Sequence, residues 1–230
     1  MMVFRRRRTI TPAVVVGDRI AAAPAGYAAV HTRADLLRHA ALLDPLPSAG
    51  EVRVVATPGR SAGSWNLDVV ARDRPGLLAM FTGVLVHEAM QIDQAVVATW
   101  DDGAALQALV VRSDRAPDAE SLRTALAWSL DQALSAPPVE GATVRFDQSL
   151  SEVYTACEIT GPDRPGLLHA VAVAIANSGA DIHGASVTTV GGRAVDRFDL
   201  SDRNHTRLDD AVAEVIARNL RKGFSGTLDN

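Results

Sequence analysis

The strongest constraint on this chain is the six-residue segment DRPGLL, which occurs at 73–78 and again, without a change, at 163–168. The two copies lie ninety residues apart in a chain of 230 residues. Self-similarity at a fixed offset indicates that one structural unit is used more than once. We therefore expect two copies of one small fold rather than a single large domain.

The apolar pattern around the hexamer also repeats, and it predicts the same elements in each half. Alternating apolar residues before each copy are typical of a half-buried strand, and an apolar stripe at helical spacing after each copy is typical of a helix. Both halves then continue with a second strand, a third strand and a second helix, at 90–99, 104–112 and 118–134 in the first half and at 180–189, 193–201 and 206–221 in the second.

The segment ATVRFDQ at 142–148 is predicted to complete the first unit as its fourth strand. Each unit then has the order strand–helix–strand–strand–helix–strand, which gives an α+β, ferredoxin-like fold with an antiparallel sheet and two helices on one face. The second unit ends in KGFSGTLDN, a poor strand. We hypothesise that EVRVVAT at 51–57 fills that vacant fourth position, where it would cover an open sheet edge. The two units could join into one eight-stranded sheet, within the chain or across a dimer.

The predicted organisation is an N-terminal extension, 1–58, followed by two repeat units, 59–148 and 149–230. The extension combines a disordered start, a helix at about 33–44 and the strand at 51–57. Its beginning, MMVFRRRRTITPAVVVG, carries basic residues and a short apolar run. Because that run is too short for the apolar part of a signal peptide, we expect a poorly ordered tail rather than a secretion signal.

Composition excludes several classes of partner. The chain is 47% apolar and 22% charged, which is typical of a soluble globular protein. Its formal net charge of −4 does not suggest a nucleic-acid partner. No apolar stretch approaches the roughly 18 residues needed to cross a membrane. The single cysteine, Cys157, fits a reducing compartment and is expected in the core. We expect a cytoplasmic protein that binds neither nucleic acid nor membrane.

The residues do not suggest catalysis, a metal site or a cofactor. The histidines are scattered, and none is directly followed by aspartate; they are His31, His39, His87, His169, His183 and His205. His39, within LLRHAALL, is expected to be an ordinary helix residue. We therefore expect no catalytic residues, no metal and no cofactor, and we do not expect an enzyme.

The hexamer lies between the first strand and the first helix of each unit, and it allows two interpretations. Pro75 suits the first turn of a helix, and Asp73 could cap the free amides ahead of it. Gly76 lets another backbone or a ligand approach closely. The hexamer could be only a good turn and helix start. It could also form a cradle of amides at the positive end of a helix dipole, suited to an amino-acid carboxylate.

A strand that ends in DRPGLL, an apolar helix and then GADIHGASVTTVGGRAVDRFDLSD at 179–202 resemble an ACT domain, the βαββαβ module that senses small molecules. The pair of units resembles more closely still the tandem ACT pair at the C-terminus of the bifunctional uridylyltransferase/uridylyl-removing enzyme that modifies the PII nitrogen-signalling protein. The likeness extends upstream to AAAPAGYAAVHTRADLLRHAALLDP at 21–45, so that roughly residues 20–222 share it.

The resemblance implies a ligand between the strand–helix loop of one unit and the second strand of a partner unit. The implied loop positions are Asp73, Arg74, Gly76, Leu77, Asp163, Arg164, Gly166 and Leu167, and the implied strand positions are Gln91, Ile92, Asp93, Asp181, Ile182 and His183. The family often carries Asn near these strand positions, where this chain has Asp and His. Asp181 and His183 are two apart on a strand and should share a face, as an ammonium-binding or pH-sensitive pair or as part of a solvated face.

The resemblance implies a non-catalytic regulatory protein that senses an amino acid, with glutamine as the first candidate ligand. The paired aspartates of the uridylyltransferase and the clustered metal ligands of its HD domain have no counterpart in this sequence. A homodimer is expected, and a regulated protein partner is possible. The alternative is a structural or interaction adaptor that binds no ligand. A solvent-open pocket at the hexamer would favour the sensor. A pocket filled by side chains would favour the adaptor.

Overall fold

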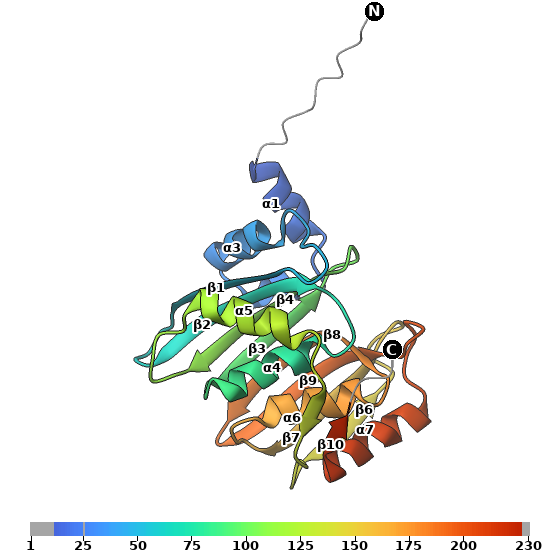
Figure 1. Ribbon diagram of the computed structural model, residues 1–230. Coiled ribbons are helices and arrows are strands. Elements are labelled where there is room, and N and C mark those ends of the chain that lie inside the picture. Colours follow the sequence, from blue (N-terminus) through green and yellow to red (C-terminus); the bar gives the residue numbers. More distant parts are fainter. Residues whose placement is uncertain (1–11, 25, 227–230) are drawn as a thin grey trace, which may run out of the picture.

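The centre of the protein is one eight-stranded antiparallel sheet, seen in the computed structural model, which describes residues 12–24 and 26–226 (Figure 1). The strand order across the sheet is β1-β2-β4-β3-β8-β9-β7-β6. The strands of this sheet are β1 (Val52–Pro58), β2 (Ser64–Arg72), β3 (Gln91–Thr99), β4 (Ala104–Arg112), β6 (Thr143–Asp147), β7 (Thr155–Pro162), β8 (Asp181–Val190) and β9 (Arg193–Ser201). The predicted α+β, ferredoxin-like architecture is confirmed, and the eight-stranded sheet forms within the chain.

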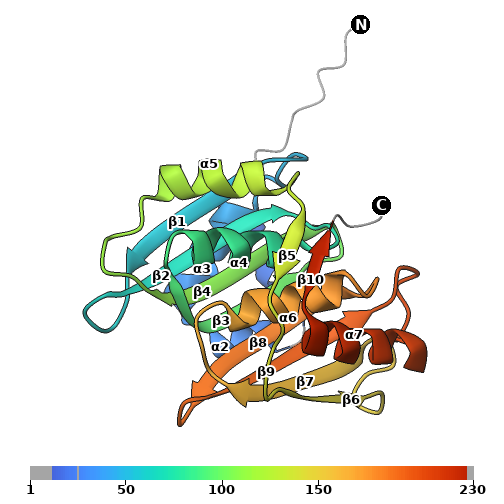
Figure 2. The same cartoon turned by 60° about the horizontal axis from the view of Figure 1, so that its bottom comes forward.

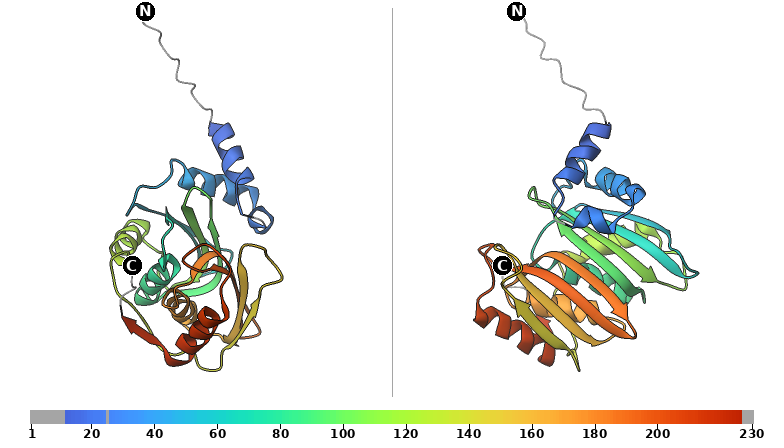
Figure 3. Two further views of the ribbon diagram at one scale, coloured as in Figure 1. Left: turned by 90° about the vertical axis from the view of Figure 1, so that its right-hand side faces the viewer. Right: turned by 180° about the vertical axis from the view of Figure 1, so that it is seen from behind.

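Helices cover the two faces of the sheet unequally. One face carries α4 (Leu77–His87), α5 (Ala119–Ser129), α6 (Leu167–Ala176) and α7 (Asp210–Lys222). The other face carries α1 (Pro12–Ala21), α2 (Tyr27–Val30) and α3 (Arg33–Leu43). Figure 3 shows that these three N-terminal helices lie over the first half of the sheet, while the strands of the second half remain in view from behind.

The apolar stripes predicted after each hexamer form the core. Leu78, Phe81 and Leu85 of α4 are fully buried, and Leu168, Val171 and Ile175 hold the same positions in α6. Cys157 is buried among them, as expected, and burial raises the pKa of its thiol to about 12. The second face has its own core, built from Tyr27, Leu43, Val70, Ala98, Trp100, Ala104 and Leu106.

The two units meet along a seam at which β3 pairs antiparallel with β8, from Gln94 opposite Thr188 to Ala98 opposite Gly184. On the helix face, α4 and α6 lie side by side over this seam (Figure 2). They approach closely at Gly83, where an added Cβ atom would lie 3.0 Å from the His169 ring. The seam therefore joins the units both through the sheet and through the helices.

The fourth strands are not where the sequence analysis placed them. β1 pairs with β2 of its own unit, and the strand at 142–148 pairs, as β6, with β7 of the second unit. Both segments form the predicted strands, but the partner predicted for each was wrong, since the strand that fills each fourth position precedes its unit. A short connection closes each hairpin, and short loops cost less conformational entropy than a crossing to the far edge. We propose that the boundary between the units lies before β6.

The segments that follow the second helices pair with each other. β5 (Leu134–Ala136) and β10 (Phe224–Gly226) form a separate two-stranded antiparallel sheet (Figure 2). They occupy equivalent places in the repeat, ninety residues apart. The poor strand predicted at the end of the chain therefore does find a partner, outside the main sheet.

The N-terminal extension is more ordered than the sequence predicted. The helix expected at 33–44 is α3, which begins with a capping box between Thr32 and Asp35. The expected disordered start lies partly outside the described residues, but α1 begins at Pro12 and was not predicted. Long-range contacts hold it, because Arg19 forms ion pairs with Asp44 at 2.6 Å and Asp102 at 2.7 Å. Ion pairs with such distant residues cannot be predicted from the helix propensity of the α1 segment.

A buried polar cluster fastens α3 to the sheet. The Tyr27 hydroxyl donates to Nδ1 of His39 at 2.6 Å, and Nε2 of His39 lies 3.1 Å from Oδ1 of Asp68. Nε of Arg38 donates to Oδ2 of Asp68 at 2.5 Å. Burial alone would raise the pKa of Asp68, but the hydrogen bonds from His39 and Arg38 outweigh it and hold that pKa below its usual value. His39 is thus a packed helix residue, as predicted.

Within the described residues, no helix has the length and apolar character needed to cross a membrane. No group of three or more histidine, cysteine, aspartate or glutamate side chains there could hold a metal ion.

We predict that Asp68→Ala lowers the free energy of unfolding by about 3 kcal/mol, because it leaves the buried His39 side chain without its acceptor and takes one of two carboxylate partners from the half-buried Arg38. Urea unfolding at pH 7 measures this. Asp93→Ala is the matched control, since it removes an exposed ion pair with Arg112, for which we expect about 0–1 kcal/mol. Equal losses from the two variants would contradict the role given to the buried cluster.

Candidate functional site at the seam

Both copies of the hexamer adopt the same backbone conformation. Each helix begins directly after a glycine in the left-handed region, Gly76 with φ 78° and ψ 7° and Gly166 with φ 78° and ψ 4°. In both copies the N–H of the following leucine donates to the carbonyl of the arginine three residues earlier, at 3.1 Å. Only glycine adopts this conformation without strain. The duplicated sequence is therefore a duplicated turn.

The predicted capping role of Asp73 was wrong, and so was the placing of Pro75 in the first helical turn. The helix starts after Gly76, and no side chain caps it. Because the left-handed glycine turns the chain, Asp73 lies outside the helix end. Its backbone N–H donates to the carbonyl of Gly103 at 2.8 Å, and its carboxyl group lies near Asp181 of the other unit.

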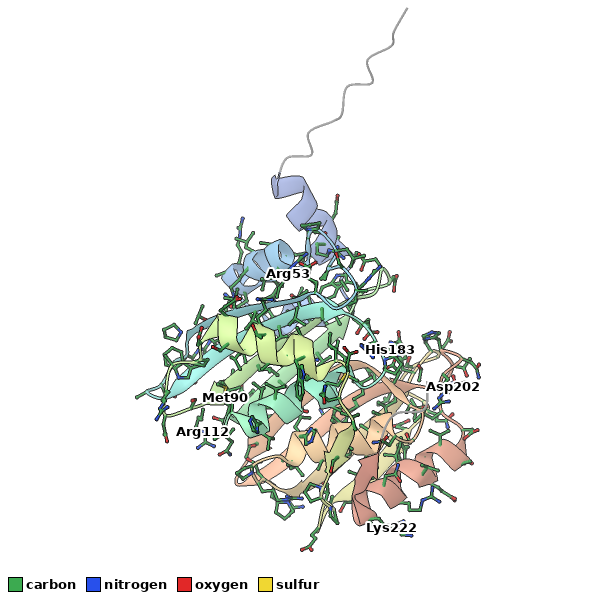
Figure 4. All side chains as sticks on the ribbon, in the orientation of Figure 1. Arg53, Met90, Arg112, His183, Asp202 and Lys222 are labelled. Atoms are coloured by element: carbon green, nitrogen blue, oxygen red, sulfur yellow. The ribbon has the colours of Figure 1, made fainter. Side chains whose placement is uncertain are left out.

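Each turn lies against the second strand of the other unit. Since β3 and β8 are antiparallel, the first residues of these two strands lie at opposite ends of the seam. Figure 4 shows this arrangement through Met90, just before β3, and His183, near the start of β8, which lie at opposite ends. The fold thus produces two equivalent places, each formed by a hexamer from one unit and a strand from the other.

A small cavity occupies each of these places. The first seam cavity is lined by Asp73, Arg74, Gly76, Leu77, Leu78, Val97, Thr99, Ala105, Gln107, Ala176, Ala180, Asp181 and Ile182. The second seam cavity is lined by Val86, Met90, Gln91, Ile92, Asp163, Arg164, Pro165, Gly166, Leu167, Leu168, His169, Val187, Thr189, Ala194 and Asp196. Each has a volume of about 20 Å³, which is room for about one water molecule.

The first seam cavity adjoins a larger cleft, and the two share Asp73, Arg74, Ala176, Ala180 and Asp181. This outer cleft has a volume of about 600 Å³. It is also lined by Pro75, Met80, Leu130, Asp131, Gln132, Gly179, Asp202, Arg203 and His205. The first hexamer therefore borders an open cleft as well as the small cavity, and the cleft is rich in acidic side chains.

The second hexamer is held more firmly, by the linker between the units. Nη2 of Arg164 donates to the carbonyl of Pro138 at 2.7 Å, and Nε2 of His169 lies 2.9 Å from the carbonyl oxygen of Ser135. The Thr189 hydroxyl donates to the carboxylate of Asp163 at 2.8 Å. The first two bonds join the second turn and α6 to the segment 134–138, and the third joins the turn to β8.

Both cavities contain buried oxygen atoms that have no hydrogen-bond partner among the described residues. In the first these are Oγ1 of Thr99 and Oε1 of Gln107, and in the second it is Oδ1 of Asp196. Gln107 lies between Val69 and Val97 in the sheet, and Asp196 lies between the equivalent residues of the second unit. Unpartnered buried polar atoms are costly and uncommon. Their presence in both cavities points to a polar occupant.

One carboxyl group in each cavity has a strongly raised pKa. Burial raises the pKa of Asp73 to about 7, and the nearby carboxylate of Asp181 contributes further. Burial likewise raises the pKa of Asp196 to about 7, with a smaller contribution from Asp163. Each cavity therefore holds a carboxyl group that is easily neutralised near pH 7 and that a cation would favour in its charged form.

Twelve of the fourteen site residues predicted from the sequence line the two cavities, and Asp93 and His183 do not. A β-bulge follows Ile92, and another follows Ile182, so that the next residue in each strand leaves the expected alternation. Asp93 instead pairs with Arg112 at 2.7 Å. His183 bonds to the hydroxyl of Ser201 at 2.8 Å and stacks on Tyr154, and burial lowers its pKa. The expectation that Asp181 and His183 share a face stays a prediction: only Asp181 lines the cavity, although its charge acts on His183 and opposes the effect of burial on the His183 pKa.

Thr99, Gln107 and Asp196 were not predicted as site residues from the sequence. A signal for the last two was present, because each is the one polar residue among the inward positions of an apolar strand. In AALQALVVR, Gln107 alternates with Ala105, Leu109 and Val111, and in RAVDRFDLS, Asp196 alternates with Ala194, Phe198 and Leu200.

Comparison with known families agrees with this architecture. Residues 155–220, from β7 into α7, match the ACT domain. The second unit of the chain is an ACT domain. The first unit repeats the same strands and helices around its own copy of the hexamer. The resemblance on which the sequence analysis relied is confirmed.

The curated relatives are much longer enzymes. The bifunctional uridylyltransferase/uridylyl-removing enzyme of Gluconobacter oxydans is 30% identical and matches 76% of this chain and 21% of its own length. The enzyme of the same name from Rhodospirillum rubrum is also 30% identical, over 81% of this chain and 24% of its own length. The chain thus spans about a fifth to a quarter of these relatives.

Among solved structures, aspartate kinase from Synechocystis matches 69% of this chain and 26% of its own, with a TM-score of 0.41 and 18% sequence identity. This likeness is too distant to bear on function.

We predict that Asp196→Asn stabilises the protein above pH 7 and has little effect near pH 4. The pKa of Asp196 is about 7 in the folded state against 3.8 unfolded, so its contribution to stability falls as pH rises from about 4 to about 7. The gain at pH 8 is expected to be 1 to about 4 kcal/mol, since one pKa unit corresponds to about 1.4 kcal/mol.

Urea unfolding at pH 4 and pH 8 measures this effect. Asp147→Asn is the control of opposite sign, because hydrogen bonds from Ser149 hold the pKa of Asp147 below its usual value. Its removal should cost stability at pH 8 and not at low pH. A pH-independent effect of Asp196→Asn would show that this carboxyl group is not perturbed in the folded protein.

Proposed function

We propose that this protein is a non-catalytic regulatory module that binds an amino acid at the seam, with glutamine as the first candidate. One observation carries the proposal. Each hexamer turn lies against the second strand of the other unit, around a cavity whose buried polar atoms lack partners. The ACT match and the uridylyltransferase/uridylyl-removing relatives support the same assignment.

The helix ends at the two turns suit the carboxylate of an amino acid. The first and fourth N–H groups of α4 and of α6 are already bonded, to the carbonyls of the arginine and glycine of the hexamer. The second and third N–H groups of each helix have no partner within the helix, as at every helix start. The positive end of the helix dipole adds to their attraction for an anion. Gly76 and Gly166 leave these amides unobstructed by a side chain.

The remaining groups of the first cavity suit the other parts of glutamine. Asp73 and Asp181 lie at the cavity mouth, which the cavity shares with the outer cleft, and either could accept hydrogen bonds from an α-ammonium group. Oγ1 of Thr99 and Oε1 of Gln107 are acceptors within the cavity, and a side-chain amide could donate to them.

Binding would require the seam to open. About 20 Å³ admits one water molecule and not an amino acid, so a ligand must move the hexamer turn or enter through the outer cleft. A ligand that favours a more open seam shifts the balance between two arrangements of the units, which is how a binding module transmits a signal. Small cavities are therefore compatible with a sensor, provided that the seam moves.

The alternative proposal is an adaptor that binds no ligand, and the small volume of both cavities favours it. In that case, the hexamer is retained for its turn alone and the cavities hold only water. The open sheet edges at β1 and β6 would then be the places for a protein partner or for the homodimer, which stays a prediction.

We predict that a panel of the twenty amino acids raises the melting temperature of the protein with at least one ligand, glutamine first. A ligand present at 100 times its dissociation constant adds about 2.7 kcal/mol of stability. Thermal-shift measurements detect this, and isothermal titration calorimetry gives the affinity. The shift should disappear in Gly76→Val if the ligand occupies the first cavity, or in Gly166→Val if it occupies the second.

Gly50→Val is the matched control, because Gly50 also has a positive φ of 78° but an added Cβ atom there meets nothing within 4 Å. It imposes similar backbone strain outside both cavities and should leave the ligand shift intact. No shift with any amino acid would favour the adaptor. A shift that survives both Gly76→Val and Gly166→Val would place the ligand elsewhere.

A further inference from the structure

The two seam cavities share one backbone but have chemically different floors. Gln107 forms the floor of the first and Asp196 that of the second, at equivalent positions of the third strand in each unit. Each is 1% exposed, and each has one side-chain oxygen without a partner. One unit thus presents a neutral amide where the other presents a carboxyl group.

We infer that this floor residue decides which amino acid each cavity takes: Asp196 selects a side chain that ends in a cationic group, and Gln107 selects one that ends in a neutral hydrogen-bond donor. The inference rests on the proposed function, because it assigns ligand classes to the same two cavities. It makes the protein a sensor of two different amino acids rather than of one.

In the part of the chain that the structure describes, no cationic side chain pairs with Asp196 in the second cavity. Arg164 is directed to the carbonyl of Pro138, and His169 lies between the carbonyls of Ala79 and Ser135. Asp163, the other acid of this cavity, accepts a hydrogen bond from Thr189. A buried carboxylate without a partner is costly, whereas a ligand ammonium would supply both a charge and hydrogen bonds.

In the first cavity the acidic groups lie at the mouth and not at the floor. Asp73 and Asp181 border the outer cleft as well as the cavity, whereas Gln107 borders the cavity alone. The acids can therefore meet the α-ammonium group that every amino acid carries. The side chain of the ligand would then reach the neutral oxygens of Thr99 and Gln107, for which an amide or hydroxyl donor is the fitting partner.

The entrance to the second cavity has parts that can move. Met90 lies beside the cavity, and methionine side chains adapt their shape easily. The hydrogen bond from Arg164 to Pro138 spans an exposed site and can open with the turn. The cavity has room for about one water molecule, so the side chain of an amino-acid ligand can enter only if Met90 and Arg164 shift.

Isothermal titration calorimetry at pH 7 with L-lysine, L-norleucine and L-glutamine tests the inference. Norleucine matches the carbon chain of lysine but lacks its side-chain ammonium. We expect the intact protein to bind lysine at the second cavity at least about tenfold more tightly than norleucine. Asp196→Asn should remove that preference, while glutamine binding at the first cavity stays unchanged.

Asp199→Asn is the matched control. It removes one carboxyl group from the same strand, at an exposed position on the opposite face of the sheet, and should leave lysine binding unchanged. A second readout is proton release. Because the pKa of Asp196 is about 7, pairing with lysine should expel a proton and make the binding enthalpy depend on the buffer, in the intact protein and not in Asp196→Asn.

The outcomes separate the inference from the proposed function. If lysine and norleucine bind alike, or if Asp196→Asn keeps the preference for lysine, the inference is wrong while amino-acid binding stands. If Asp196→Asn changes stability but no ligand affinity, the floor has a structural role with water alone. If none of the three ligands nor any other amino acid binds the intact protein, the proposed function fails, and the inference with it.

Discussion

The antiparallel pairing of β3 with β8 is the interaction on which the rest of the structure depends. It makes one eight-stranded sheet from two units, and it brings α4 and α6 together at Gly83 and His169. Because the pairing is antiparallel, it also carries each hexamer turn to the second strand of the other unit. Both candidate sites therefore exist within one chain, without a second copy of the protein.

The repeat of one unit gives two cavities at equivalent places, and different side chains in the two units make these cavities chemically different. The turns, the glycines and the apolar helices are the same, whereas the linker holds the second turn through Arg164 and leaves the first beside an open cleft. The floor residues Gln107 and Asp196 differ in charge. A repeated backbone with different polar contents is a simple way to obtain two recognition sites from one fold.

Much of this could be predicted from the sequence, because the repeat and its apolar periods record local structure. The bounds predicted for the third strands, 104–112 and 193–201, agree with the structure at every residue, since the apolar alternation and the preceding turns define them.

The partners of β1 and β6 could not be predicted, because strand pairing depends on which edge is nearest in space. The position of Asp93 and His183 depends on β-bulges, which add a residue without a clear signal. The helix α1 depends on the ion pairs of Arg19 with distant residues.

The most direct test of the account is a two-dimensional NMR titration of the isotope-labelled protein with the amino acid that stabilises it most. The account predicts that backbone amides shift in pairs across the seam, at 73–78 together with 180–182 for the first cavity, or at 163–168 together with 90–92 for the second. Shifts confined to one unit, or gathered at the sheet edges β1 and β6, would contradict it.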